Sequence, residues 1–563
     1  DYIGFTNLAT VSGNATSLTG IATSFNDATQ VSGSGIDYGG LASLATVAGD
    51  GAATITGVAG SFNDATLVSA ASTIDYSGFN AVSGTGGAVT NVTGNFSLDT
   101  LVSTASGVSY SGFNVGTVAG TGGGTITGTA RTYNVTGANI GNSGAVSWTN
   151  FTSLSDAGGG TFNITTGSLS GTIAGGTGST LSYAGNAGPV GVNLQTGAAT
   201  AVAGGISGIN NLVGSGSAGD ALTGTNASAT WTINAANGGT LSTGFTFASF
   251  ENLTGGSADD NFVLSGGIVS GAINGGGGSD TLAGSTTYSI SGANTGTATG
   301  VASFTSIETL TGTGGNDTFT LQAGVATFNG TINGGAGSDS LAATNGTNNW
   351  VLTSVGNGTL NTTTSFTSIE TMVGGSGTDN LSGSAPGGTT TMTDPTVLLI
   401  GPLNATGGVL NFTAGSLGGT GFAVADSGTF SSGTSVIGMG IDIANNLHMD
   451  GAATLWNFSA GSDAGSFSVA NANISVQVGG VIRVASVGQQ QAAAAIGNVA
   501  EQIGATIVEE ANKTFGTDSV AEDVEYGFAG EIGATPPMDH RIDESGISLP
   551  RCVQEAREGL PCK

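Results

Sequence analysis

The sequence is very poor in positively charged residues. Its 563 residues include 7 Lys and Arg against 36 Asp and Glu, which gives a net charge of −29. No lysine precedes Lys513, and Arg131 is the only arginine before Arg483. Because proteins bind nucleic acids by placing Lys and Arg against phosphates, this composition excludes a nucleic-acid-binding protein. It also leaves trypsin-like proteases few places to cut, which suits an exposed, secreted protein.

Other residue types are scarce as well. Charged residues make up 8% of the chain, against about 25% in a typical globular protein. There is no apolar run of the length that a transmembrane helix needs, so we expect no transmembrane segment. His448 and His540 are the only histidines, and neither belongs to a recognisable nucleophile–base pattern. We therefore expect that the protein is not an enzyme.

Glycine is abundant, with 104 residues, and much of it lies in a repeated phrase. The phrase begins at Phe247, Phe304 and Phe366, continues through a Glu and a Gly-rich turn, and reaches an Asp that precedes an apolar residue. Its copies recur at intervals of about 57 to 62 residues, which we interpret as three coils of roughly 20 residues each. Coils of this size with short strands and Gly-rich turns are typical of a parallel β-helix.

Residues 1–160 carry a shorter cycle of aromatic residues. One phase consists of Tyr2, Tyr38, Tyr76, Tyr110 and Trp148, and a second phase includes Phe25, Phe62 and Phe96. We interpret each cycle as a pair of coils of about 18 residues. Because aromatic residues favour strands, residues of equal phase are expected to stack above one another in the core rather than form a carbohydrate-binding stripe.

The sequence therefore predicts an all-β protein, an elongated parallel β-helix with coils of about 18–20 residues. At about 4.8 Å per stacked strand, roughly 24 coils would make a rod on the order of 115 Å long. The expected segments are coils with a paired-coil repeat over 1–160, coils with a three-coil Gly-rich repeat over 161–383, terminal or capping coils over 384–486, an amphipathic helix over 487–516 and an acidic tail over 517–563.

The helix and the tail differ in composition from the coils. Ile496, Val499 and Ile503 fall on one helical face, which is expected to cover the end of the coil stack. Cys552 and Cys562 are the only cysteines. Two cysteines do not make a zinc site, and outside the cell we expect them to form a disulfide that closes a loop of the tail.

The coils rich in Gly, Asn, Ser and Thr resemble filamentous-haemagglutinin-like proteins, which are β-helical exoproteins and adhesins exported by two-partner secretion in Gram-negative bacteria. The resemblance covers residues 1–485 and rests on pattern. It implies an extracellular or bacterial cell-surface location and passage through an outer-membrane secretion pore. In some of these adhesins a C-terminal cysteine loop anchors the protein in that pore, which gives Cys552 and Cys562 an alternative role.

The Gly-Gly-x-Gly-x-Asp turns also resemble the calcium-binding turns of repeat-in-toxin proteins. The candidate calcium ligands are Asp260, Asp280, Asp317, Asp339 and Asp379. Calcium needs six to eight oxygen ligands, and these turns are isolated, so one Asp per turn does not complete a site. The alternative is that each Asp is a turn residue whose carboxylate binds backbone N–H groups.

We expect a non-enzymatic extracellular structural protein, a β-helical rod that acts as a surface filament, a matrix element or an adhesin. Since Asp1-Tyr2 stands in mid-repeat, head-to-tail polymerisation is one form of this expectation, with the C-terminal tail clasping the next subunit. Its partners would then be copies of itself, or a host or neighbouring-cell surface. A monomeric C-terminal fragment of a two-partner-secreted adhesin is the alternative. A secreted polysaccharide hydrolase with paired carboxylates is the least favoured reading.

Overall fold

The structure is a computed structural model, and it describes most of residues 10–484. The exceptions are residues 14, 42, 114–116, 326, 420–421, 432–434, 438–439, 450–454, 459–466, 470–472 and 477–480, and residues 540–542 and 548–550 are also described. Side chains are described as far as Phe412. Within these ranges every regular element is a strand, and no helix is long and apolar enough to cross a membrane.

The strands of the first part of the chain are short. They are β1 (Thr10–Gly13), β2 (Ser17–Ile21), β3 (Ser24–Asn26), β4 (Val31–Ser32), β5 (Asp37–Leu41), β6 (Thr46–Val58), β7 (Phe62–Asn63), β8 (Val68–Ser69), β9 (Asp75–Gly84), β10 (Val89–Val92), β11 (Phe96–Ser97), β12 (Val102–Ser103), β13 (Ser109–Ser111), β14 (Val118–Gly120), β15 (Thr125–Gly128), β16 (Thr132–Gly137), β17 (Ile140–Ser143), β18 (Val146–Thr149) and β19 (Ser153–Asp156).

The strands of the middle of the chain are also short. They are β20 (Thr161–Ile164), β21 (Ile173–Ser182), β22 (Gly191–Asn193), β23 (Ile206–Val213), β24 (Ala221–Thr223), β25 (Thr230–Ala235), β26 (Gly238–Leu241), β27 (Thr246–Ala248), β28 (Asn252–Gly256), β29 (Asn261–Leu264), β30 (Val269–Gly276), β31 (Thr281–Ala283), β32 (Thr287–Gly292), β33 (Thr295–Ala298), β34 (Val301–Thr305), β35 (Thr309–Thr311), β36 (Thr318–Leu321), β37 (Gly330–Asn333), β38 (Ser340–Ala342), β39 (Asn349–Ser354), β40 (Asn357–Leu360), β41 (Thr364–Thr367), β42 (Thr371–Val373) and β43 (Thr378–Ser384).

Longer strands follow. They are β44 (Thr389–Gly419), β45 (Phe422–Ser431), β46 (Ser435–Ile437), β47 (Gly440–Met449), β48 (Leu455–Phe458), β49 (Phe467–Val469), β50 (Asn473–Val476) and β51 (Val481–Val484), with an antiparallel pair β52 (His540–Ile542) and β53 (Ser548–Pro550). The chain divides into two compact units, the first formed by Asp1–Asp280 with Gly300–Ala302 and the second by Thr281–Thr299 with Ser303–Lys563.

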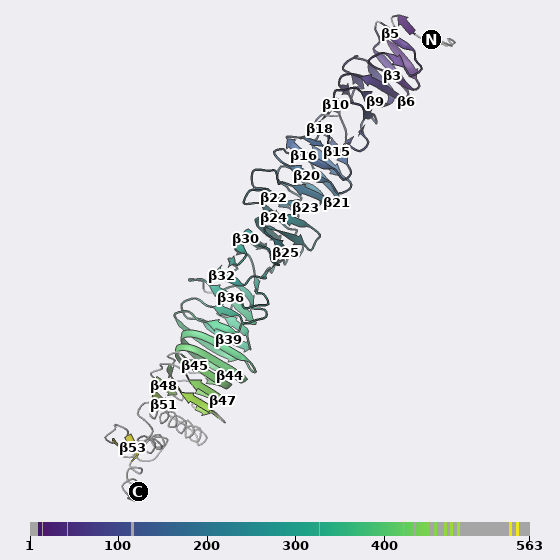
Figure 1. Ribbon diagram of the computed structural model, residues 1–563. Helices are drawn as coiled ribbons and strands as arrows, with labels where there is room; N and C mark the ends of the chain where they lie inside the picture. The colour runs from purple at the N-terminus through teal and green to yellow at the C-terminus, as the bar shows by residue number, and fades with distance from the viewer. Residues whose placement is uncertain are drawn as a thin grey trace, which may run out of the picture. The chain divides into compact units, whose positions relative to one another are not determined.

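Each unit is a parallel β-helix, in which strands of successive coils pair in parallel. In the first unit β16 pairs with β20, and β20 pairs with β21 (Figure 1). Tyr133, Phe162 and Leu181 occupy the same position on these three strands, and all three side chains are buried. Since side chains alternate along a strand, this register lines the inside of the coils with apolar residues and leaves polar residues outside.

The second unit shows the same arrangement with a row of hydroxyl groups outside. On strands β32, β36, β38, β42 and β44 the paired outward residues are Thr287, Thr318, Ser340, Thr371 and Thr391. The residues that follow them along each strand point inward and are buried: Tyr288, Phe319, Leu341, Met372 and Met392. The alternation in the sequence therefore reflects the two faces of one parallel sheet: the small polar residues lie on its outer face and the large apolar residues on its inner face.

Coils of two lengths alternate. Leu154 pairs with Ile173 at an offset of 19 residues, and Leu253 pairs with Ile273 at an offset of 20, which agree with the predicted coil length. Trp231, however, pairs with Phe262 at an offset of 31 residues. The longer coil contains an antiparallel hairpin made by β25 and β26, with β27 beside it. Short coils of 19 or 20 residues and long coils of 31 residues therefore both occur, where the sequence suggested short coils throughout.

The aromatic residues between Phe25 and Tyr110 form an interleaved ladder. Phe25 lies 6.2 Å from Tyr76, Tyr76 lies 6.3 Å from Phe62, and Phe62 lies 6.1 Å from Tyr110, between ring centroids. Residues of the two phases therefore alternate along the stack, whereas we expected each phase to stack on itself. The cause is a three-stranded antiparallel meander such as β7–β8–β9, which folds Phe62 back onto Tyr76 within one cycle.

The predicted terminal coils are described from their backbone alone beyond Phe412. Strand β44 pairs in parallel with β45, and β45 pairs in parallel with β47, so the coil pattern continues past residue 384. The helix predicted over 487–516 and the disulfide between Cys552 and Cys562 lie outside the described residues. Of the tail, only β52 and β53 are described.

Candidate functional site: the buried aspartate turns

All five Asp residues that were candidate calcium ligands are buried at turns between coils. Their exposed fractions are 2% or less: Asp260, Asp280, Asp317, Asp339 and Asp379. Each comes directly before, or near the start of, a strand whose next apolar side chain points inward. The carboxylates therefore lie inside the turns and not on the outer surface, where they would meet a soluble partner.

In the turns of Asp260, Asp317, Asp339 and Asp379, the glycine five residues before the Asp makes room for the carboxylate. A Cβ on Gly312 would overlap Oδ2 of Asp317, and a Cβ on Gly334 would overlap Oδ2 of Asp339 as well as a neighbouring backbone carbonyl. Gly255 stands in the same relation to Asp260. Glycine is required at these positions because a side chain would occupy the space of the Asp, independently of backbone dihedral preferences.

The carboxylates accept hydrogen bonds from backbone N–H groups of the neighbouring coil. In the second unit the N–H of Asp317 donates to Oδ1 of Asp339 at 2.8 Å, and the N–H of Asp339 donates to Oε2 of Glu370 at 2.8 Å. In the first unit the N–H of Asp260 donates to Oδ1 of Asp280 at 2.7 Å. These bonds satisfy buried turn amides that have no strand partner, which would otherwise cost free energy.

Glu251 and Glu370, the Glu residues of two of the repeated phrases, also accept from backbone N–H groups of the preceding coil. Oε2 of Glu251 accepts from the N–H groups of Gly219 and Asp220 at 3.2 and 3.0 Å, and its Oε1 accepts from Nδ2 of Asn237 at 2.9 Å. Glu251 thus joins the turn of the preceding coil to the hairpin of its own coil. In this sequence motif (an apolar residue, Glu, any residue, Leu), the Glu side chain therefore forms hydrogen bonds that hold neighbouring coils together.

Buried aspartates of the first unit also bind aromatic hydroxyl groups, which the sequence analysis missed. Asp27 accepts from the Tyr76 hydroxyl at 2.5 Å and from Oγ of Ser69 at 2.6 Å, and Asp64 accepts equivalently from Tyr110 and Ser103. The signal in the sequence was the recurrence of Phe-Asn-Asp at Asp27 and Asp64. Burial, together with the adjacent Asp27, raises the pKa of Tyr76 well above its usual range, so the tyrosine stays a hydrogen-bond donor.

Asp260 and Asp339 each keep one carboxylate oxygen without a hydrogen bond to a described residue. Oδ2 of Asp260 and Oδ2 of Asp339 are buried and have no partner among the described residues. Burial raises the pKa of both carboxyl groups, and for Asp339 the neighbouring Asp317 and Glu370 raise it further. An unsatisfied, desolvated carboxylate favours its protonated form, because the charge is poorly stabilised there.

The turns bring together fewer carboxylates than calcium requires. Asp260 lies beside Asp280, and Asp317 beside Asp339, while Asp379 accepts from the backbone N–H and Nδ2 of Asn348. Among the described residues, no group of three or more His, Cys, Asp or Glu side chains is placed to hold a metal ion. Since most of the oxygens already accept N–H groups and calcium needs six to eight ligands, calcium binding stays a prediction.

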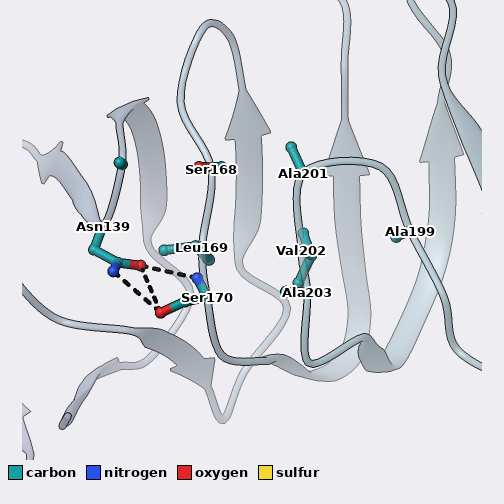
Figure 2. Close-up of a pocket in the computed structure, with 9 residues that line it drawn as sticks. Asn139, Ser168, Leu169, Ser170, Ala199, Ala201, Val202 and Ala203 are labelled. Atoms are coloured by element: carbon teal, nitrogen blue, oxygen red, sulfur yellow. Dashed lines mark hydrogen bonds between the residues drawn. The ribbon is translucent and has the colours of Figure 1, made fainter. Parts of the chain in front are cut away.

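A shallow depression lies on the first unit near the hairpin of β16 and β17. It has a volume of about 390 Å³ and is lined by Leu169, Val202 and small side chains (Figure 2). Its main polar group, Asn139, is occupied: Nδ2 donates to Oγ of Ser170 at 3.1 Å, and Oδ1 accepts from the Ser170 N–H at 2.9 Å. Asn237 forms the same pair of hydrogen bonds with Ser270, so these Asn–Ser pairs also join one coil to the next.

Comparison with known proteins finds no family model and no curated protein that matches the chain. The structure confirms the all-β, mostly parallel β-helix that the sequence predicted, and neither the filamentous-haemagglutinin-like nor the repeat-in-toxin family is shown for this chain.

Proposed function

We propose that the protein is a non-enzymatic extracellular structural protein whose stacked coils form a surface filament or an adhesin. One observation carries the proposal: polar side chains of several repeated motifs form bonds between coils. Asp339, Glu251 and Asn139 each bind a backbone N–H of a neighbouring coil. Because such bonds recur along hundreds of residues, they stabilise a large, regular outer surface, which is what a structural protein requires.

The outer face suits contact with an extended surface. The row that contains Thr287, Thr318 and Thr371 presents hydroxyl groups at the spacing of paired strands, about 4.8 Å. Hydroxyl groups both donate and accept hydrogen bonds, as do the groups of a carbohydrate-covered cell surface. The near absence of Lys and Arg keeps this face from binding anionic polymers non-specifically.

Self-association is the second element of the proposal. The end of any parallel β-helix presents unpaired N–H and C=O groups, which can pair with another chain. A contact between unlike ends does not close on itself and yields an open filament. A filament of this kind would present the same hydroxyl rows along its length, so that filament and adhesin are two aspects of one function.

Light scattering and negative-stain electron microscopy of the native full chain test the proposal. We expect uniform fibres, or particles of about one chain mass that bind to cells. A soluble particle that binds no cell surface and no copy of itself would contradict the proposal. So would the breakdown of a polysaccharide during incubation, because it would show an enzyme.

A further inference from the structure

We propose that the protein carries sugar on Asn226, with Asn91 as a second acceptor. This inference rests on the proposed extracellular function. Asn-x-Ser/Thr triplets are common in the chain, since Asn, Ser and Thr are abundant, and composition alone does not rank them. The structure does rank them, because it shows which Asn carboxamides are already committed to bonds between coils.

Asn226 stands in an exposed connection between β24 and β25. All three residues of its triplet, Asn226, Ala227 and Ser228, are exposed. The backbone N–H of Asn226 donates to Oε1 of Gln195 at 2.9 Å, and the turn at Gly256 approaches its Cα on the other side. The backbone is thus held by the coils before and after it, while the carboxamide makes no hydrogen bond to any described residue.

Asn91 is the second candidate because it leaves the strand ladder. It lies in β10 with a left-handed φ of 55°, at a register shift between β10 and β14. Its side chain is exposed and makes no hydrogen bond to any described residue, and Thr93 of its triplet is exposed as well. An extra residue in a strand turns its side chain away from the ladder.

The triplets of Asn134 and Asn252, by contrast, are committed to the fold. Nδ2 of Asn134 donates to Oδ1 of Asn142 at 2.9 Å, and Oδ1 of Asn134 accepts from Nδ2 of Asn163 at 2.9 Å. Oδ1 of Asn252 accepts from the N–H of Ala272 at 3.1 Å, and its Nδ2 donates to the carbonyl of Asp220. A sugar on Nδ2 of Asn134 would break its bond across the β16–β17 hairpin, and one on Nδ2 of Asn252 would break a bond to the preceding coil, so we expect both to be unmodified.

The reaction requires a sugar activated as a diphosphate ester. Nδ2 of Asn226 attacks C1 of the sugar, the bond between C1 and the diphosphate oxygen breaks, and the diphosphate leaves with its electron pair. Nδ2 loses one proton to a base of the transferring enzyme. The product is an N-linked sugar whose bulk projects into solvent from the loop, without displacing any described contact.

The test is mass spectrometry of the full chain isolated from its native source. Digestion with chymotrypsin suits the chain, because Lys and Arg are nearly absent. We expect sugar mass on the peptides that contain Asn226 and Asn91. Asn226→Gln and Ser228→Ala should both remove it from the first peptide, with no change in melting temperature. Thr254→Ala, which destroys the triplet of Asn252, should leave the total sugar mass unchanged.

The two proposals fail in distinguishable ways. Chain recovered from the cell surface with a bare Asn226, or with sugar on Asn252, would overturn the glycosylation site and leave the extracellular function standing. Chain found only inside the cell would overturn the proposed function. If that chain also had a bare Asn226, the site would be overturned with it.

Discussion

The backbone N–H of Asp317 donates to the carboxylate of Asp339, which lies one coil later at an offset of 22 residues. Asp280 holds the turn at Asp260 in the same way, whereas the carboxylate of Asp317 accepts from Thr313 in its own turn. Asp339 is held in the same way by Glu370. The repeated acidic residues therefore form a series of bonds along the stack, and loss of one member should loosen two neighbouring coils.

The glycines of the Asp turns should be intolerant of a methyl group. We expect Gly334→Ala to lower the free energy of unfolding by about 1–3 kcal/mol, because its Cβ would overlap Oδ2 of Asp339 and the carbonyl of Ser368. Gly314→Ala is the matched control, since a Cβ there meets no atom within 4 Å. Denaturant unfolding of both variants checks this. Equal stability of the two would show that the turn has room for a side chain.

The hydroxyl group of Tyr76 should contribute to the stability of the fold through its hydrogen bond to Asp27. Tyr76→Phe removes a donor from the buried Asp27, and we expect a loss of about 1–3 kcal/mol of unfolding free energy. Tyr38→Phe is the control, because the Tyr38 ring packs near Phe25 but its hydroxyl bonds to no described residue. If thermal unfolding shows the same small change in both variants, Asp27 does not depend on this bond.

Acid should act in opposite directions on Asp156 and Asp339. Burial raises the pKa of Asp156, but N–H groups of Arg131, Gly158 and Ala130 outweigh it and hold the pKa below the usual value. Its contribution to stability is therefore present above the unfolded pKa, near 4, and is lost as pH falls through the folded pKa. Burial raises the pKa of Asp339, so its ionised form opposes folding at neutral pH and acid relieves that cost.

Two variants separate these effects. We expect Asp156→Asn to melt below the parent chain at pH 7, with the difference shrinking as the pH is lowered past 4. Asp339→Asn should melt at or above the parent at pH 7, and its advantage should disappear in acid. Melting curves across this pH range provide the measurement. The same pH dependence in both variants would contradict the assigned directions.

Arg131 should resist trypsin while the chain is folded. Its guanidinium group binds Asp99 at 2.6 Å, its N–H donates to Asp156, and its carbonyl accepts from Thr161. A protease must pull this backbone into its own site, which the bonds oppose. We expect no cleavage after Arg131 at room temperature and cleavage after heating, followed by mass spectrometry of the fragments. Rapid cleavage of the folded chain would show that this turn opens freely.

The sequence predicted the coil architecture because alternation of polar and apolar residues is a local property. The inward positions of Phe319 and Leu341, for example, could be read directly from the strands that contain them. Coil length was harder to predict from the sequence, because a hairpin such as β25 and β26 adds residues to a coil without changing the alternation of polar and apolar residues. The aromatic ladder was misjudged for the same reason: Phe62 folds back onto Tyr76, and no spacing in the sequence encodes that turn.

The acidic residues show what a motif alone leaves undecided. The Gly-rich stretches before Asp317 and Asp339 located both residues correctly in turns, yet such a stretch is compatible with a metal ligand and with a backbone acceptor. The two roles differ in what lies one coil away, and that partner is set by an offset of 22 residues which only the fold provides. The role of Asp27 was missed because its partner, Tyr76, belongs to a later cycle.

Hydrogen exchange of the backbone amides tests the central claim most directly. The N–H groups of Asp220, Asp260, Asp317 and Asp339 lie in turns, where exposed amides exchange quickly. Because each donates to a carboxylate of another coil, we expect them to exchange as slowly as amides within the strands. The exposed Gly314 in the same kind of turn should exchange fast. If the four Asp amides exchange as fast as Gly314, the carboxylates do not hold the coils together.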